Sequence, residues 1–199
     1  MFDISSLVTT GGLLGLFVLM ASGSSLMLGL FIPGDAINFV AGLLASQNIF
    51  PHLSIVIIVL IAGSVVGDSI GYFFGRKFGE RVLNRFTNDS HHAKMIRKTR
   101  KFLEKNGTKT IALSRFIPTM GTFMPFMSGA LKIKFRTFLA YDIPGITFWV
   151  TSLALIGFYL GSRFPHIYRY FIYIIFAIVL IPAIPQIFHY LKKKIERKR

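Results

Sequence analysis

The stretch Phe31-Ile32-Pro33-Gly34-Asp35 decides the fold, because its proline and glycine break an apolar run that would otherwise form one long helix. The run before the break, Gly12–Pro33, carries no charged residue, and a shorter apolar piece, Ala36–Phe50, follows it. Broken backbone is tolerated inside a membrane only where it is buried in protein or lines a polar cavity. The pattern therefore predicts a hairpin of two broken helices whose turn is covered by the rest of the protein.

The break occurs again in the second half of the chain, as Phe116-Ile117-Pro118 within the apolar segment Thr110–Leu131. Further matches follow at nearly the same offset of 85 to 87 positions: Ala41-Gly42 with Ser128-Gly129, and Ile70–Phe78 with Ile156–Phe164. Because the separate matches share one offset, we predict two repeats. Each repeat is a broken hairpin followed by a spanning helix.

Three other apolar stretches have the length of about 20 residues that a membrane span needs: Ser54–Gly75, Thr137–Gly161 and Tyr168–Leu191. The chain is 53% hydrophobic, a share that exceeds the roughly 45–50% apolar content of soluble domains. It also contains 21 Phe. These features predict a membrane protein. Gly12–Pro33 is also long enough to span, and a spanning first helix, which would break the symmetry of the repeats, stays open as an alternative.

The distribution of charge predicts the orientation in the membrane. The net charge is +15, yet residues 1–75 contain no Lys or Arg, whereas Arg76–Lys109 contains 11. Basic blocks between apolar runs are typical of cytoplasmic segments of membrane proteins and disfavour a nucleic-acid partner. We therefore expect an inner-membrane, multi-pass protein whose basic tail, Lys192–Arg199, is cytoplasmic.

The predicted fold class is an all-α polytopic membrane protein with one transmembrane domain over 1–199. With the tail inside, the two repeats have opposite orientations, each with a re-entrant hairpin and a transmembrane helix, as in secondary transporters. The predicted parts are repeat 1 (10–84), a basic cytoplasmic segment (85–109), repeat 2 (110–165), an extra C-terminal transmembrane helix (168–191) and the tail (192–199). The 85–109 segment fits either an interfacial amphipathic helix or a solvated linker.

The hairpin tips are the first candidates for a functional site. Pro33 and Gly34 match Pro118 in the second repeat, and Pro125 is a further break in that hairpin. Both tips are therefore expected near the middle of the membrane.

Asp35 follows the first tip and Arg115 precedes the second, so we predict that they form a pair or a shared site. A charged side chain at a helix centre costs about 2.5–3.5 kcal/mol on insertion scales, and pairing removes much of this cost. One interpretation is a structural ion pair that holds the hairpins together. The favoured interpretation is that Arg115 binds an anionic headgroup, while Asp35 releases it or carries a proton.

Two other acidic residues lie within the predicted spans. Asp68 is either a proton-coupling acid or a partner of Arg136 or of a hydroxyl group, whereas Asp142 is expected to be an interfacial or capping residue near the cytoplasmic face. Glycines at four-residue spacing on one helix face predict close helix packing: Gly63, Gly67, Gly71 and Gly75.

The sequence contains little that is typical of an enzyme. It has no Cys, no phosphate-binding glycine loop and no nucleophile elbow, and its five His residues lack metal-ligand spacing beyond one adjacent pair. We therefore expect no catalytic residues, no metal and no cofactor.

These motifs resemble those of the DedA family, also called the SNARE-associated or VTT-domain family. The resemblance covers about residues 10–165 and rests on an ordered set of motifs: Phe31-Ile32-Pro33-Gly34-Asp35 with Ala41-Gly42, Gly67–Tyr72 with Gly75-Arg76, Ser114–Pro118 with Pro125 and Ser128-Gly129, and Arg136–Leu139 with Trp149.

The resemblance implies a protein linked to the proton-motive force that moves undecaprenyl phosphate or phospholipids across the bilayer. Family members commonly carry a further Glu in the first hairpin and a second Arg after the first; here Gly23 and Gly121 occupy these positions. The departure puts proton coupling and the usual substrate in question. The retained pair is Asp35 and Arg115.

The sequence thus favours a translocase for an anionic lipid, with polyprenyl phosphate ahead of phospholipid. Its partners would be membrane lipids, and homo-oligomerisation stays open. A phospholipid scramblase, a membrane-organising protein without a transport cycle and a transporter of small inorganic anions are the alternatives.

Overall fold

The structure is a computed structural model that describes residues 4–24, 34–50, 52–85, 101–103, 105–117 and 120–164. These residues form helices and turns, without a strand among them, so the all-α prediction is confirmed for this part of the chain. Several predictions lie outside the described residues: the tip residues Pro33 and Pro118, most of the 85–109 segment, the 168–191 helix and the tail.

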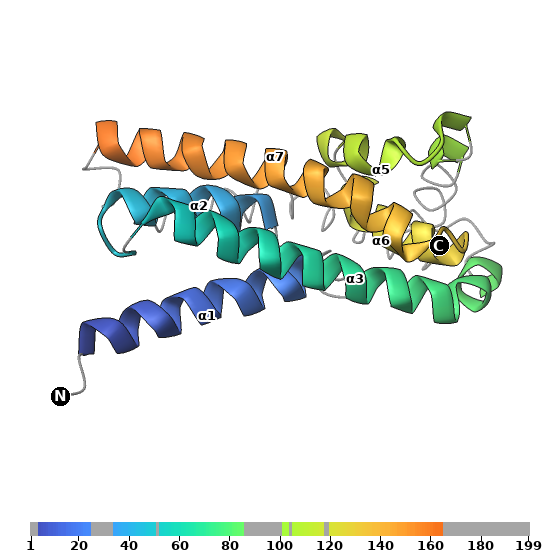
Figure 1. The fold of residues 1–199 in the computed structure, drawn as a ribbon, viewed down its shortest axis with the longest axis horizontal. Helices are drawn as coiled ribbons and strands as arrows, with labels where there is room; N and C mark the ends of the chain where they lie inside the picture. Colours follow the sequence, from blue (N-terminus) through green and yellow to red (C-terminus); the bar gives the residue numbers. More distant parts are fainter. Residues whose placement is uncertain are drawn as a thin grey trace, which may run out of the picture.

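Two long helices form the frame of the molecule. Helix α3 is Leu53–Arg85 and helix α7 is Phe135–Arg163. Both are long and apolar enough to cross a membrane, over Leu53–Gly79 and over all of α7. They run in opposite directions along the length of the molecule (Figure 1). Helix α3 is longer than predicted, because it continues through the basic residues after Gly75.

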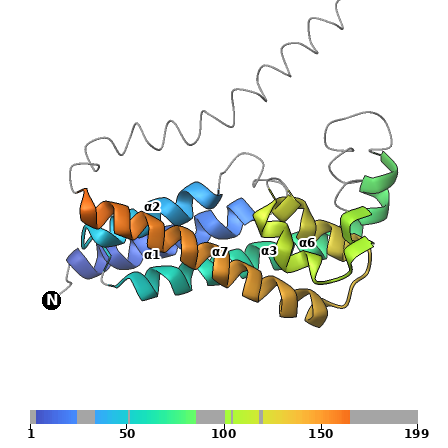
Figure 2. The ribbon, with the colours of Figure 1, turned by 90° about the horizontal axis from the view of Figure 1, so that it is seen from above.

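The shorter helices occupy opposite ends of this frame. Helices α1 and α2 lie along one half of the molecule, and α5, η1 and α6 lie along the other half (Figures 1 and 2). Their bounds are Ile4–Ser24 for α1, Gly34–Ser46 for α2, Thr110–Leu113 for α5, Ser114–Phe116 for the 3₁₀ turn η1, and Met120–Ala130 for α6. The predicted interruption of the second apolar segment is present, since η1 and the extended Ile117 follow α5 and precede α6. The first break lies mostly outside the described residues, between Ser24 and Gly34.

Helix α2 crosses α7 in direct backbone contact. A Cβ on Gly42 would overlap the carbonyl of Ala154, and a Cβ on Gly157 would overlap the carbonyl of Phe39. Only glycine permits such an approach. The two helices run in the same direction, since the Gln47 amide at the end of α2 donates to the Gly161 carbonyl, 3.0 Å away, near the end of α7.

Helix α6 crosses α3 in the same manner. A Cβ on Gly129 would overlap the carbonyl of Tyr72, and a Cβ on Gly75 would overlap the carbonyl of Phe126. In both crossings each glycine meets the residue that stands three positions before the glycine of the other helix. This crossing pattern therefore occurs twice, once between α2 and α7 and once between α6 and α3. The helix pairs α1–α2 and α5–α6 are hereafter called the first and the second hairpin.

The predicted packing role of the α3 glycines is confirmed at three positions. Gly75 contacts α6 as described, Gly71 lies against Pro125 of α6, and Gly63 lies against Phe17 of α1. One helix face therefore contacts both hairpins in turn.

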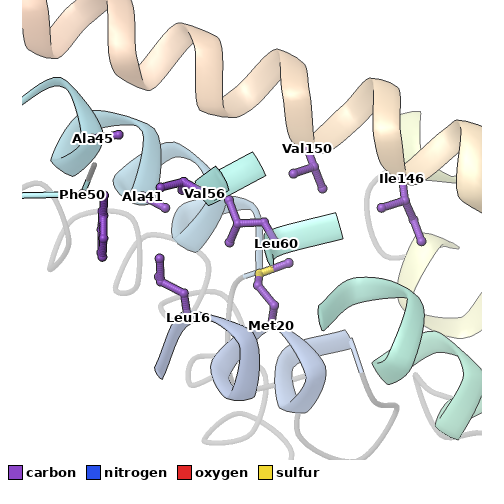
Figure 3. Packing of buried hydrophobic residues seen from close by; sticks show 9 residues of the cluster. All are labelled: Leu16, Met20, Ala41, Ala45, Phe50, Val56, Leu60, Ile146 and Val150. Atoms are coloured by element: carbon purple, nitrogen blue, oxygen red, sulfur yellow. The ribbon is translucent and has the colours of Figure 1, made fainter. Parts of the chain in front are cut away.

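The core lies between the long helices and the first hairpin. Figure 3 shows its cluster of buried apolar side chains: Leu16, Met20, Ala41, Ala45, Phe50, Val56, Leu60, Ile146 and Val150. A second cluster of buried side chains lies where α5 and α6 pack against α3 and α7: Tyr72, Leu103, Ile111, Met124 and Phe138.

The outer surface is also apolar, while several polar side chains are buried. Ile58 of α3 is 65% exposed and Phe148 of α7 is 61% exposed. The buried polar and charged side chains are Asn38, Ser64, Asp68, Thr110, Ser114, Ser128 and Asp142. An apolar exterior with polar and charged side chains kept in the interior is the arrangement that a lipid environment favours.

Candidate functional site

Arg115 lies on η1, the short turn that separates α5 from α6. The helix cannot continue through this point, because Ile117 precedes a proline and takes an extended conformation with φ −107° and ψ 114°. The Arg115 side chain is 15% exposed and is directed into the bundle. The break in the hairpin thus places one buried cation between the two long helices.

Two carboxylates bind this cation. Nη2 of Arg115 donates to Oδ2 of Asp68 on α3, and it also donates to Oδ1 of Asp142 on α7 over 3.1 Å. Both aspartate side chains are only 2% exposed. Arg115, Asp68 and Asp142, hereafter the ion-pair cluster, therefore join the second hairpin to both long helices in the interior.

The predicted pair between Asp35 and Arg115 is not formed, and this expectation was wrong. Asp35 is exposed at the start of α2, and its Oδ1 accepts a hydrogen bond of 2.7 Å from Nε1 of Trp149 on α7. The physical reason is that α2 runs alongside α7, so the nearest donor to Asp35 is on that helix.

Two further expectations need correction. Asp142, expected as an interfacial or capping residue, is buried and bound to Arg115. Asp68 has Arg115 as its partner rather than Arg136, which is exposed in the first turn of α7. The sequence held a signal for Asp142: it shares one helix face with Gly145 and Trp149, at spacings of three and seven residues.

Two of the predicted tip residues, Gly34 and Pro125, are described, and they lie on different helices. Gly34 is the first residue of α2, whereas Pro125 lies inside α6, buried against α3, and does not mark the hairpin break. Gly121, in the first turn of α6, is a direct neighbour of Arg115, since a Cβ there would lie 3.7 Å from Arg115 Cα and Cδ.

An aromatic group extends from the site to the surface of the molecule. Phe116, next to Arg115, packs edge-on against Trp149 with ring centres 5.5 Å apart, and it lies 5.7 Å from the ring of Phe148. Phe116 is 48% exposed. Trp149 therefore contacts both Asp35 of the first hairpin and Phe116 of the second.

Some polar atoms of the site have no hydrogen-bond partner among the described residues although they are buried. Within the ion-pair cluster these are Nε of Arg115 and Oδ2 of Asp142. Asn38 Oδ1 and Thr110 Oγ1 share this property. Free donors and acceptors of this kind give the interior residual capacity to bind a polar group or a proton.

The described residues contain no group of three His, Asp or Glu side chains that could hold a metal ion. The ion-pair cluster itself offers electrostatic chemistry. A guanidinium provides planar donors suited to carboxylate or phosphate, and an exposed apolar surface lies directly beside it.

Comparison with known proteins agrees with the motifs. Residues 32–159 match the VTT domain. The chain is 32% identical to the Protein DedA of Escherichia coli (strain K12) over 182 residues, which covers 90% of this chain and 82% of that protein. It is also 32% identical to an uncharacterized membrane protein of Mycobacterium tuberculosis (strain ATCC 25618 / H37Rv), over 77% of this chain and 68% of the relative.

A third relative, the inner membrane protein YohD of Escherichia coli (strain K12), is 24% identical over 81% of this chain and 85% of its own length. No solved structure matches the chain significantly. The domain match spans more than half of the sequence, and the membrane proteins that the chain resembles are matched over most of their length. The chain therefore belongs to the DedA family of VTT-domain membrane proteins.

Proposed function

We propose that this protein moves an anionic lipid across the membrane, with undecaprenyl phosphate as the preferred substrate and the proton-motive force as the source of energy. The observation that carries the proposal is the ion-pair cluster, a buried guanidinium in the interior of an apolar-surfaced helix bundle. Such charges are costly in a membrane and are usually kept for transport or binding. Arg115 would bind the phosphate in exchange for one of its carboxylates.

We also propose that the two halves are inverted repeats, with re-entrant hairpins formed by α1–α2 and by α5–α6. The repeated glycine crossings support this arrangement, since α2 and α6 occupy equivalent positions on α7 and α3. The opposite directions of α3 and α7 support it as well. Repeats of this kind around a central site are typical of transporters with alternating access.

The proposed orientation follows from the basic residues. Arg76, Lys77, Lys101, Lys105 and Lys109 all belong to the basic block Arg76–Lys109, which covers the end of repeat 1 and the segment that follows it. We place this block and the C-terminus on the cytoplasmic side of the inner membrane, where each basic residue gains about 1 kcal/mol from anionic lipids.

A lipid substrate is favoured over a small inorganic anion by the aromatic group beside Arg115. Phe116, which follows Arg115 in the sequence, and Phe148, which precedes Trp149, are exposed apolar rings in contact with each other. A lipid could place its headgroup at the cluster and its apolar tail along these rings without leaving the bilayer. A small anion would gain nothing from this surface.

A membrane-organising protein without a transport cycle is the second candidate. The observation that favours it is that Arg115 is already bound to two protein carboxylates, which suits a structural ion pair. In either case we propose that the protein performs no covalent chemistry and has lipids, not nucleic acids, as partners.

The test is translocation of fluorescent polyprenyl phosphate in liposomes that contain the full chain, with and without a pH gradient. Arg115→Lys keeps the charge but loses the planar donor set, so we expect a folded variant with translocation reduced at least tenfold. Equal rates for the wild-type protein, Arg115→Lys and empty liposomes would reject a transport function. Uptake of inorganic phosphate without lipid movement would instead identify an anion transporter.

A further inference from the structure

The ion-pair cluster contains more negative than positive charge. Arg115 supplies one positive charge, whereas Asp68 and Asp142 supply two negative charges when ionised. Both carboxylates are 98% shielded from solvent, so an unbalanced charge in this position is costly. The cluster therefore needs one more positive charge than the protein side chains within it provide.

The helices packed around the cluster do not provide that charge. The sequences of α5 and α6 contain no charged residue, and the acid of α2, Asp35, is bound to Trp149. The described basic residues of α3 and α7 lie toward the helix ends, and Tyr72, the nearest phenol on α3, is engaged with Arg76 and the Ile133 carbonyl. Tyr141, next to Asp142 in the sequence, carries no positive charge.

The two carboxylates differ in a way that indicates where a proton would bind. Both carboxylates contact Nη2 of Arg115, and Asp142 does so at 3.1 Å through Oδ1 alone. Oδ2 of Asp142 is buried and has no hydrogen-bond partner among the described residues. A proton on this oxygen would balance the charge of the cluster without breaking any existing contact.

Resting on the proposed function, we propose that Asp142 is the proton-binding residue of the site, and that its proton makes Arg115 available to the substrate headgroup. With the proton bound, Asp142 is a neutral and weaker partner, and an anionic headgroup can take its place on the guanidinium. When the proton leaves, the carboxylate regains Arg115 and displaces the headgroup. Proton and anionic headgroup therefore bind together and leave together.

This exchange has a quantitative consequence. If only the protonated form binds, the apparent dissociation constant rises in proportion to the loss of that form. Over the pH range in which Asp142 is mostly ionised, affinity should fall about tenfold for each unit of rising pH. The isosteric change Asp142→Asn removes the titration and keeps a polar side chain of the same shape.

The experiment measures binding of farnesyl phosphate to the full chain in lipid nanodiscs between pH 5 and pH 8. Trp149 is the only tryptophan of the chain and contacts Phe116 beside Arg115, so its fluorescence reports on the site. The ratio of wild-type to Asp142→Asn affinity at each pH cancels the titration of the probe itself. We expect this ratio to fall about tenfold per unit of rising pH, with Asp142→Asn binding more tightly than wild type at pH 8.

A second variant keeps the test decisive if Asp142→Asn is poorly folded. Gly121→Arg would add a cation next to Arg115, where a Cβ would make only ordinary van der Waals contacts with Ser114 and Arg115. It should balance the cluster without a proton and thus also reduce the dependence of affinity on pH. Ser152→Ala, which removes an exposed hydroxyl bonded only to its own helix, is the matched control on α7 and should behave as wild type.

Three results would overturn the inference. A constant ratio of wild-type to variant affinity across the pH range would exclude Asp142 as the proton site while leaving the proposed function standing. Loss of binding at all pH values in a folded Asp142→Asn protein would assign Asp142 to positioning Arg115 only. Wild-type protein that binds no farnesyl phosphate at any pH would reject both the inference and the proposed function.

Discussion

Nε1 of Trp149 lies 2.7 Å from Oδ1 of Asp35, and this hydrogen bond fixes the start of α2 against the middle of α7. The same indole contacts Phe116 of the second hairpin. Trp149 is therefore in contact with both hairpins, and a change at this residue should affect their relative positions.

Replacing Trp149 with Phe should reduce lipid translocation about threefold to tenfold. The variant keeps an aromatic ring for Phe116 but loses the donor to Asp35, and a net hydrogen bond of this kind contributes about 0.5–1.5 kcal/mol. Translocation in liposomes and a double-mutant cycle with Asp35→Asn measure the effect. If the loss of translocation in the double variant equals the sum of the two single losses on a free-energy scale, the hydrogen bond has no role in transport.

Replacing Gly129 with Ala should destabilise the protein by about 1–3 kcal/mol, because the new methyl group would overlap the Tyr72 carbonyl in the crossing of α6 with α3. Denaturant unfolding in detergent micelles measures the change. Gly15→Ala is the control, since nothing lies within 4 Å of a Cβ at this exposed position of α1. An unchanged unfolding midpoint for Gly129→Ala would contradict the close crossing.

Replacing Arg115 with Gln should destabilise the protein by about 3–5 kcal/mol, because two buried carboxylates lose their partner. Adding Asp142→Asn should restore part of this loss, since only one unpaired carboxylate then remains. The free energies of unfolding of the two single variants and the double variant give the coupling. A double variant whose loss equals the sum of the single losses would argue against the Arg115–Asp142 contact.

Cysteine labelling should place the two ends of the molecule on opposite sides of the membrane. The native chain has no Cys, so single substitutions give unambiguous signals. Asn106→Cys is expected to react only from the cytoplasm, and His52→Cys only from outside; both residues are exposed. Reaction of both from the same side would reject the proposed orientation and the inverted repeats with it.

Much of the fold could be predicted from sequence because apolar length and helix-breaking motifs determine where helices begin and end. The two long helices and the broken second hairpin followed from Ser54–Gly75, Thr137–Gly161 and the break near Arg115. Pro125 was misplaced because proline at a break and proline within an apolar helix give the same sequence pattern; its packing against Gly71 is a tertiary fact.

The partners of the site residues could not be predicted as reliably. Asp35 and Arg115 were paired because both are next to hairpin breaks, but the partner of each was set by the helix that its hairpin packs against. Asp142 was misjudged because its closeness to the start of α7 suggested a position at the membrane surface. In the structure the second hairpin packs against the start of α7 and brings Arg115 next to Asp142. Ala112 of this hairpin contacts Gly145, which lies one turn after Asp142 on α7.

The glycine crossings join four of the described helices into two closely packed pairs, α2 with α7 and α6 with α3. Helices that touch through their backbones cannot shift against each other without a clash, so relative movement has to take place between the pairs. The Arg115–Asp68 bond lies on the α6–α3 side, whereas the Arg115–Asp142 bond connects one pair to the other. Arg115 itself stands between α5, which contacts α7 at Gly145, and α6, which is joined to α3, so a rocking motion of the two pairs would have to break one of these two bonds.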